Sequence, residues 1–270
     1  MAQRSAEASK LLASPISPDE ATAVGAMQAR VDELLGGREG LRVLEAGCGP
    51  RLNLKFPPGT YVIGVDEDEV ALARNEELSE AIVADLGGYQ VEPASLDAVV
   101  CWYVLEHVDR PAEIITGFAR AVKPGGIIAL AVPNLHSPKS VITKFTPHMF
   151  HVWFRRHILG RKLAGTPGHG PYPTTLRRAI APGSMTRLAE RLGLDVVHVG
   201  WYEDGKQIQA REKAHVTGAA WSAVRGAVKV GSLGVLDAAR SEFLVILRRR
   251  PDAAVPAVRQ QAAEVPSLAE

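Results

Sequence analysis

The sequence is poor in cysteine and has no long apolar runs. Its 270 residues include two cysteines, Cys48 and Cys101, which are too few for a disulfide framework. Both lie in or beside apolar runs that predict buried strands, which favours a reducing compartment. No stretch is apolar enough for long enough to cross a bilayer, and no signal peptide is evident at the N-terminus. We therefore expect a soluble, cytoplasmic protein.

A third glycine is missing from the most informative motif. The run from Leu41 to Pro50 predicts a strand followed by a glycine turn, and a second strand ends at Asp66. Gly47 and Gly49 can take backbone angles closed to other residues, and Asp66 can accept hydrogen bonds from both hydroxyls of a ribose. A nicotinamide-binding loop would need a glycine where Leu52 stands. The pattern therefore indicates a nucleoside site of another kind.

This acid-x-Gly-x-Gly turn, with Glu45 as the acid, resembles the first motif of class I S-adenosylmethionine-dependent methyltransferases. Later segments resemble further motifs of that family in the expected order. They are Glu80–Leu86, Leu96–Val108 and Val122–Gly126. The resemblance covers about 42–134 and, more loosely, 192–248.

The resemblance implies an α/β fold with a Rossmann-like open sheet, mostly parallel with an antiparallel last strand, helices on both faces and an insertion after strand 5. Strand-like runs that alternate with helical patterns point the same way. With 46% hydrophobic residues, the chain can bury one full core, so we expect a single domain over 1–250. A capping pattern predicts an N-terminal helix over 17–37. Residues 251–270 have the composition of a disordered tail.

One departure from the family concerns the first crossover. Between Gly49 and Tyr61 the chain has only about a dozen residues, several of them proline, where the family usually has a helix. We expect an abbreviated crossover that offers fewer backbone N–H groups to the methionine carboxylate of the donor. Arg51 could compensate by charge, or it could be a solvated loop residue.

The resemblance also implies which residues hold S-adenosyl-L-methionine as the cofactor. They are Glu45, Gly47, Gly49, Asp66, Asp85, Leu86 and Trp102. In this family the acid at the third strand faces the adenine amino group, which assigns that role to Asp85 and places Leu86 beside the ring. Trp102 or Tyr103 would flank the sulfonium or the acceptor channel.

An oxygen acceptor must lose a proton, and the nearest candidates for its general base are His107 and Tyr103. His107 could equally bond the backbone of its own turn. We expect no metal site, because no cysteine or carboxylate accompanies the histidines that follow residue 147.

Two insertions carry what is particular to this chain. The first, 134–181, leaves the carboxyl end of the fifth strand, where acceptor-binding elements sit in open α/β sheets. No acidic residue lies between Glu113 and Glu190, although the chain's formal charge is only +1. The basic residues of the insertion are Lys139, Lys144, Arg155, Arg156, Arg161, Lys162, Arg177 and Arg178. They would attract an acceptor with phosphate or carboxylate groups, or a membrane surface, unless they form a solvated face paired with acids elsewhere.

Aromatic residues, among them Phe150 and Trp153, interleave with these bases, and they could stack on a ring-containing acceptor or form a local core. The second insertion, 204–241, has valines and alanines at four-residue spacing beside Arg225 and Lys229. It predicts an amphipathic basic helix. Such a helix could pack on the sheet, form a homodimer seam or rest on an anionic lipid surface.

The sequence therefore predicts an enzyme that methylates a small or amphipathic, anionic acceptor, such as a lipid, quinone, glycan or natural-product intermediate. Two alternatives stay open. One is a non-catalytic S-adenosylmethionine-binding or scaffold protein. The other, less favoured, is an RNA methyltransferase, because the chain shows no separate nucleic-acid recognition module.

Overall fold

The computed structural model describes residues 2–157, 160, 162–163, 165, 174–254 and 256. Its centre is a seven-stranded sheet with the order β3-β2-β1-β4-β5-β7-β6, in which β7 runs antiparallel to both of its neighbours and the other pairs are parallel. The strands are β1 Arg42–Ala46, β2 Tyr61–Asp66, β3 Glu80–Val83, β4 Leu96–Trp102, β5 Val122–Pro133, β6 Leu194–Tyr202 and β7 Glu242–Arg249. This topology confirms the predicted fold class.

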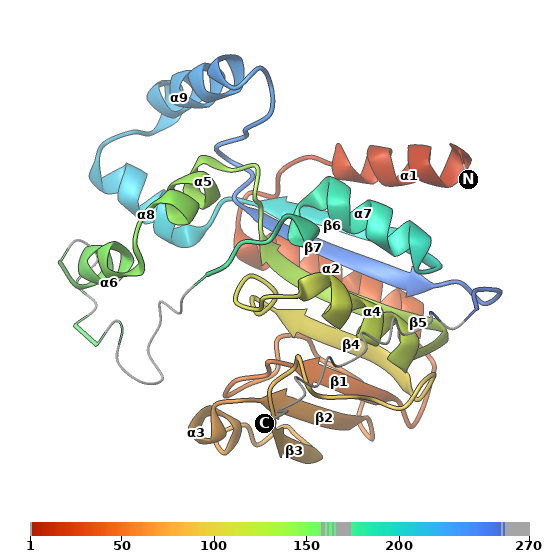
Figure 1. Ribbon diagram of the computed structural model, residues 1–270. Coiled ribbons are helices and arrows are strands. Elements are labelled where there is room, and N and C mark those ends of the chain that lie inside the picture. Colours follow the sequence, from red (N-terminus) through yellow and green to blue (C-terminus); the bar gives the residue numbers. More distant parts are fainter. Residues whose placement is uncertain are drawn as a thin grey trace, which may run out of the picture.

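Helices cover both faces of the sheet, with α4 and α7 on one face and α2 on the other (Figure 1). The helices are α1 Ala2–Leu12, α2 Glu20–Leu35, α3 Glu69–Leu72, α4 Pro111–Ala121, α5 Pro138–Phe145, α6 His148–His157, α7 Pro182–Arg191, α8 Gly205–Lys213 and α9 Gly218–Gly231, with a 3-10 turn η1 at Arg178–Ile180. The parallel strands point toward the end of the molecule that carries α5, α6, α8 and α9 (Figure 1).

Each face of the sheet has its own apolar core. On one face, Ile115 of α4 and Met185 of α7 are fully buried against strand residues such as Val99. On the other face, Met27 and Leu35 of α2 are buried. The central strand β4 is buried over almost its whole length, which explains its nearly continuous apolar sequence.

The N-terminal helix is shorter than the predicted 17–37. Asp19, rather than Ser17, is its N-cap: the Asp19 carboxylate accepts the N–H of Thr22 at 2.7 Å. The helix ends at Leu35 with Gly36 as its C-cap. A further helix, α1, precedes it and lies beside β6; the sequence had given no indication of it.

The abbreviated first crossover is confirmed, because the chain passes from β1 to β2 without a helix. Helix α4 ends at Ala121, because Val122 belongs to β5 and pairs with Leu96. The second insertion forms two helices, α8 and α9, instead of one. The predicted tail over 251–270 lies largely outside the described residues.

Candidate active site

The two glycines of the turn after β1 both have positive φ angles, 72° at Gly47 and 55° at Gly49, but for different reasons. A Cβ at Gly47 would lie 2.2 Å from Cγ2 of Val104, so this glycine lets the turn after β4 pack against the loop. A Cβ at Gly49 would meet no atom of the described residues within 4 Å. Space for a ligand is therefore left beside Gly49.

Asp66 organises the glycine turn from the end of β2. One carboxylate oxygen accepts the N–H of Gly49 at 2.8 Å, and the other accepts the N–H of Asp68 at 2.9 Å. Each oxygen has lone pairs to spare, because a carboxylate offers about four acceptor sites. Asp66 can therefore hold the turn and a pair of hydroxyl groups at the same time.

Glu45 is a buried carboxylate at the end of β1, with an exposed fraction of 1%. Its Oε1 accepts the backbone N–H of Asn53 at 3.3 Å and the Asn53 side-chain amide at 2.8 Å. Its Oε2 has no hydrogen-bond partner among the described residues. Burial raises the pKa of Glu45 to about 7 against the lowering effect of Asn53. Such a group gains from a cationic ligand.

Asp85 and Leu86 follow β3 at the edge of the sheet. The Asp85 carboxylate is exposed and accepts the N–H of Gly87 at 3.1 Å. Leu86 is half-buried against the core. The structure thus places a hydrogen-bonding group beside an apolar one, as an adenine ring would require.

Trp102 is the last residue of β4, and Tyr103 follows it with an unusual φ of 55°. The two rings meet edge to face with their centroids 6.3 Å apart. The Tyr103 hydroxyl makes a short hydrogen bond with the hydroxyl of Tyr202, which lies on β6. Burial, and then the nearby Glu242, raise the pKa of Tyr103 far above the phenol range. Tyr103 is therefore a neutral hydroxyl, suited to donate a hydrogen bond and poorly suited to take up a proton.

His107 lies in the turn after β4, half-buried, with Nε2 3.9 Å from Oε1 of Glu106. Glu106 is buried, and burial raises its pKa to about 8. The backbone of this turn is tied to the end of the first insertion, because the N–H of Thr175 donates to the carbonyl of Glu106 at 2.8 Å. Tyr103 therefore contacts β6, whereas the turn that carries His107 contacts the end of the first insertion.

The two insertions are joined at their base by Lys139 of α5. Its ammonium bonds to the carboxylates of Glu242, at the start of β7, and of Asp204, just before α8; the second contact is 2.7 Å. Burial would lower the pKa of Lys139, but the two carboxylates outweigh it and raise the value. Nearby, the Asn134 amide donates to the carbonyl of Arg240 at 2.6 Å. These contacts link the start of the first insertion to the end of the second.

Helix α6 of the first insertion presents a row of stacked rings. The rings of Phe150 and Trp153 are 5.8 Å apart, and those of Trp153 and His157 are 5.4 Å apart, both nearly parallel. Trp153 is 49% exposed. Of the two alternatives that the sequence left open, a local core is disfavoured, because Phe150 and Trp153 are both exposed. The side chains of Phe154 and Arg155, and all of Arg161, lie outside the described residues.

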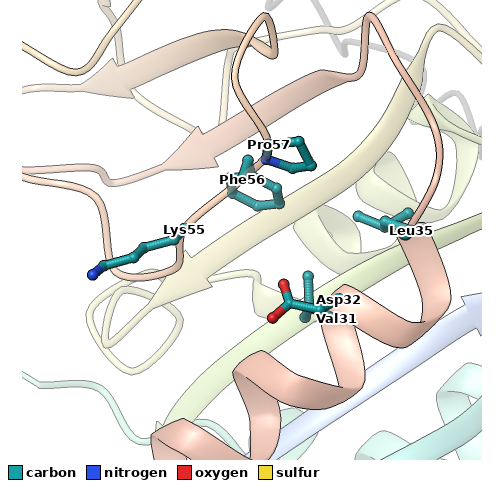
Figure 2. Close-up of a pocket in the computed structure, with 7 residues that line it drawn as sticks. Val31, Asp32, Leu35, Lys55, Phe56 and Pro57 are labelled. Atoms are coloured by element: carbon teal, nitrogen blue, oxygen red, sulfur yellow. The ribbon is translucent and has the colours of Figure 1, made fainter.

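Two hollows lie beside α2. One, of about 150 Å³, is lined by α2 and the crossover, including Leu35, Lys55 and Phe56 (Figure 2). No predicted site residue lines it, and the Gln28 side chain closes this junction through paired hydrogen bonds with the backbone of Lys55. The other, of about 480 Å³, lies where α2 and α8 begin. Its residue Glu20 is 3.4 Å from the hydroxyl of Tyr202, so this larger hollow adjoins the Tyr103–Tyr202 pair.

Sequence reasoning missed Asn53 and Tyr202 as parts of this region, and it named Lys139 as a cation of the insertion without its carboxylate partners. Asn53 stands only eight residues after Glu45 in a crossover too short for a helix, so its proximity could have been inferred. The Tyr103–Tyr202 pair joins strands that are distant in sequence, and no local pattern announces it. Among the described residues no group of His, Cys, Asp and Glu could hold a metal ion. None of the helices in the described ranges has the length and apolar content to span a bilayer.

Comparisons with known proteins agree with this geometry. The family model of a methyltransferase domain matches residues 20–199. A ubiquinone biosynthesis O-methyltransferase from Leptothrix cholodnii is 27% identical over 62% of this chain and 70% of its own length. A protein of the same name from Dechloromonas aromatica is 32% identical over 58% of this chain and 65% of its own length. The chain thus spans about two thirds of the length of these relatives.

The fold has relatives among solved structures. A SAM-dependent methyltransferase from Archaeoglobus fulgidus superposes with a TM-score of 0.50 at 18% identity, over 84% of this chain and 93% of that one. At this identity the likeness concerns the fold alone. With the family match over most of the described sheet, the chain belongs to the methyltransferase domain family and is an S-adenosylmethionine-dependent methyltransferase.

Proposed function

We propose that this enzyme is an O-methyltransferase of a small, hydroxyl-bearing, amphipathic and anionic acceptor. The observation that carries the proposal is the ring row of α6, which lies in an insertion without acidic residues. The relatives' name, ubiquinone biosynthesis O-methyltransferase, supports oxygen as the methylated atom and a ring-containing acceptor.

The donor site in this proposal is the end of the first three strands. Three features fit S-adenosylmethionine. The Oε2 atom of Glu45, which has no partner among the described residues, suits the ammonium of the donor, and the space beside Gly49 lets the donor approach the protein backbone. Asp66 retains lone pairs that can accept hydrogen bonds from the ribose. Asp85 and Leu86 would take the adenine, and Trp102 would flank the sulfonium. These assignments are proposals for the individual residues.

When bound, the donor supplies a methyl group on a positively charged sulfur, which is an excellent leaving group. The task left to the protein is to hold the acceptor oxygen in line with that methyl group and to keep water out. Trp102 and the α6 rings offer flat apolar surfaces for this purpose. The larger hollow beside α2 is lined by Asp19, Glu20 and Glu203, so it suits a hydroxyl-bearing part of the acceptor and not its anionic group.

His107 and Tyr103 have different parts in the proposed mechanism. An imidazole accepts a proton readily near neutral pH, so we assign proton removal from the acceptor hydroxyl to His107. Tyr103, kept neutral by burial and bonded to Tyr202, would help to position the acceptor, an adjustment of the role predicted from sequence. Replacing His107 by Gln should lower kcat with little change in the KM of the donor, whereas Tyr103→Phe should raise the KM of the acceptor.

The test of the proposed function has two stages. Calorimetry with S-adenosylmethionine measures donor binding, and methyl transfer is then assayed against quinone precursors, lipids, glycans and RNA. Transfer to a hydroxylated ring supports the proposal. Donor binding without transfer to any of them would make the chain a binding or scaffold protein, and transfer to RNA would make it an RNA methyltransferase.

Arg155 and Arg156 test the anionic part of the acceptor. Reversing both to Glu should impair use of the acceptor and leave donor affinity intact, since a cationic surface attracts the acceptor only. The matched control is the same reversal at Arg187 and Arg191, on α7 and remote from the insertion. Equal turnover of the first variant and the wild type would show that the basic insertion is merely a solvated face.

We also propose that residues 1–250 form a single domain and that the chain forms a homodimer. Analytical ultracentrifugation of the full chain tests the second.

A further inference from the structure

Helix α9 contributes nothing to the core. None of its 14 residues is buried, and the helix stands apart from the sheet, beyond the end toward which the parallel strands point (Figure 1). It contains three glycines and three valines, which disfavour helix in isolation. A helix of this length is marginal in water unless one of its faces packs against something. Within the described part of the chain, Arg211 of α8 lies over the ring of Trp221 at 5.0 Å, but most of α9 faces solvent. The composition of α9 therefore calls for a further surface.

Apolar side chains on α9 and on the turn that follows it face solvent. The exposed fraction is 77% at Val230 and 94% at Leu233, and Val224 and Val235 are also exposed, at 40% and 61%. Four exposed large aliphatic side chains within twelve residues mark a candidate interaction surface. We call residues 218–235 the α9 surface.

The α9 surface carries only positive charge. No acidic residue occurs from Lys213 to Leu236. The cations Arg225 and Lys229 lie on successive turns, and within the described ranges neither has an ion-pair partner. A partner of α9 must therefore be both apolar and negatively charged.

We propose that the α9 surface docks on an anionic lipid membrane. Such a membrane offers an apolar layer for Val230 and Leu233 and negative headgroups for Arg225 and Lys229. A second copy of the chain would be a poorer match, because an isologous contact would bring together two copies of a surface that has cations and no acid to compensate them.

A second part of the chain is suited to the same plane. Near the end of α5 and on α6, Phe145 and Met149 are each 79% exposed and Trp153 is 49% exposed, beside the exposed Lys144. Aromatic and basic residues together are characteristic of membrane interfaces. Helices α5, α6 and α9 all lie at the end of the molecule that holds the candidate site (Figure 1). Docking there would bring that end close to the lipid, whatever the acceptor is.

The test is co-sedimentation of the full chain with phosphatidylcholine vesicles made with or without phosphatidylglycerol. The wild type should bind only the anionic vesicles, and salt should weaken the binding. Reversing Arg225 and Lys229 to Glu should reduce the binding by roughly 30-fold or more, since each cation near such a surface contributes noticeably. The matched control, Arg187→Glu with Arg191→Glu, has the same spacing on α7 and should bind like the wild type.

A second variant examines the apolar contact. Val230→Ser with Leu233→Ser should also weaken vesicle binding while its circular dichroism and thermal melting stay unchanged, since both side chains are exposed. Equal binding to neutral vesicles, no binding, or equal loss in the α7 control would overturn the proposal. A concentration-dependent dimer that the serine variant abolishes would assign the surface to a second copy instead. Donor affinity is measured on the same samples, so that failure of the proposed methyl transfer is seen separately.

Discussion

The ends of β1 and β2 and the segments that follow β5 and β6 are built in opposite ways. At the first site, carboxylates are turned inward and bonded to backbone N–H groups, as Asp66 is to Gly49. In the insertions, apolar and basic side chains are turned outward, as Trp153 and Val230 are. The first arrangement fixes a small ligand of known shape. The second offers a surface whose partner comes from outside.

The comparison with relatives separates the two insertions from each other. The methyltransferase family model ends at residue 199 and so excludes α8 and α9. The O-methyltransferases from Leptothrix cholodnii and Dechloromonas aromatica align with about 60% of the chain. The first insertion, with α5 and α6, lies inside the matched range, whereas the second insertion lies beyond it.

The largest expected effect is a difference in folding stability between alanine variants of Gly47 and Gly49. Gly47→Ala should destabilise the fold by about 3 kcal/mol, because its Cβ would overlap Val104 and its positive φ would be strained. Gly49→Ala should cost about 1 kcal/mol, the strain alone, yet should weaken donor binding. Denaturant unfolding and calorimetry with S-adenosylhomocysteine measure the two quantities. Equal loss of stability in both variants would contradict the different roles assigned here.

Asp66 tests the ribose contact. Asp66→Ala should weaken donor binding at least tenfold, a loss of about 1.4 kcal/mol or more, because the variant loses the hydroxyl contacts and the hold on Gly49. The matched control is Asp68→Ala, which removes the N-cap of α3 two residues away and should leave donor affinity nearly unchanged. Unchanged affinity in the Asp66 variant would exclude this residue from the site.

Glu45 should make donor binding depend on pH. Its pKa of about 7 lies above the unfolded value, so its protonation favours the folded state; this contribution is complete below about pH 4.5 and is lost as pH rises through 7. A donor ammonium pairs only with the carboxylate, so affinity should rise up to about tenfold per pH unit between about pH 5.5 and 7, where an α-amino group stays protonated. Calorimetry in buffers of different ionisation enthalpy should detect proton release. Glu45→Gln should abolish both effects, and a pH-independent wild type would refute the pairing.

The smallest effect is expected in the α6 ring row. Trp153→Ala should raise the acceptor KM about fivefold, a loss of about 1 kcal/mol of ring contact, with donor affinity unchanged. Phe145→Ala is the control, since this ring is also exposed but lies outside the described stack. The prediction fails if the two variants raise the acceptor KM equally.

The sequence predicted those features of the site that depend on residues close together in the chain. Glycines at fixed spacing and an acid at a strand end predicted the turn at Gly47 and the position of Asp66, because chain geometry forces such residues together. It was uninformative where contacts join distant segments: nothing near Tyr103 predicts Tyr202 as its partner, and nothing near Lys139 predicts Glu242. The second insertion was predicted as one helix, but it breaks where His215 and Gly218 take positive φ angles. Helix α1 escaped prediction because its apolar residues are few and it lies at the sheet edge.

The close packing of Val104 on Gly47 joins the glycine turn after β1 to the turn after β4. Any shift of the donor loop must be transmitted to the turn after β4, and His107 follows Val104 by only three residues. Donor binding at the glycine turn should therefore restrain the turn that carries His107, the proposed base.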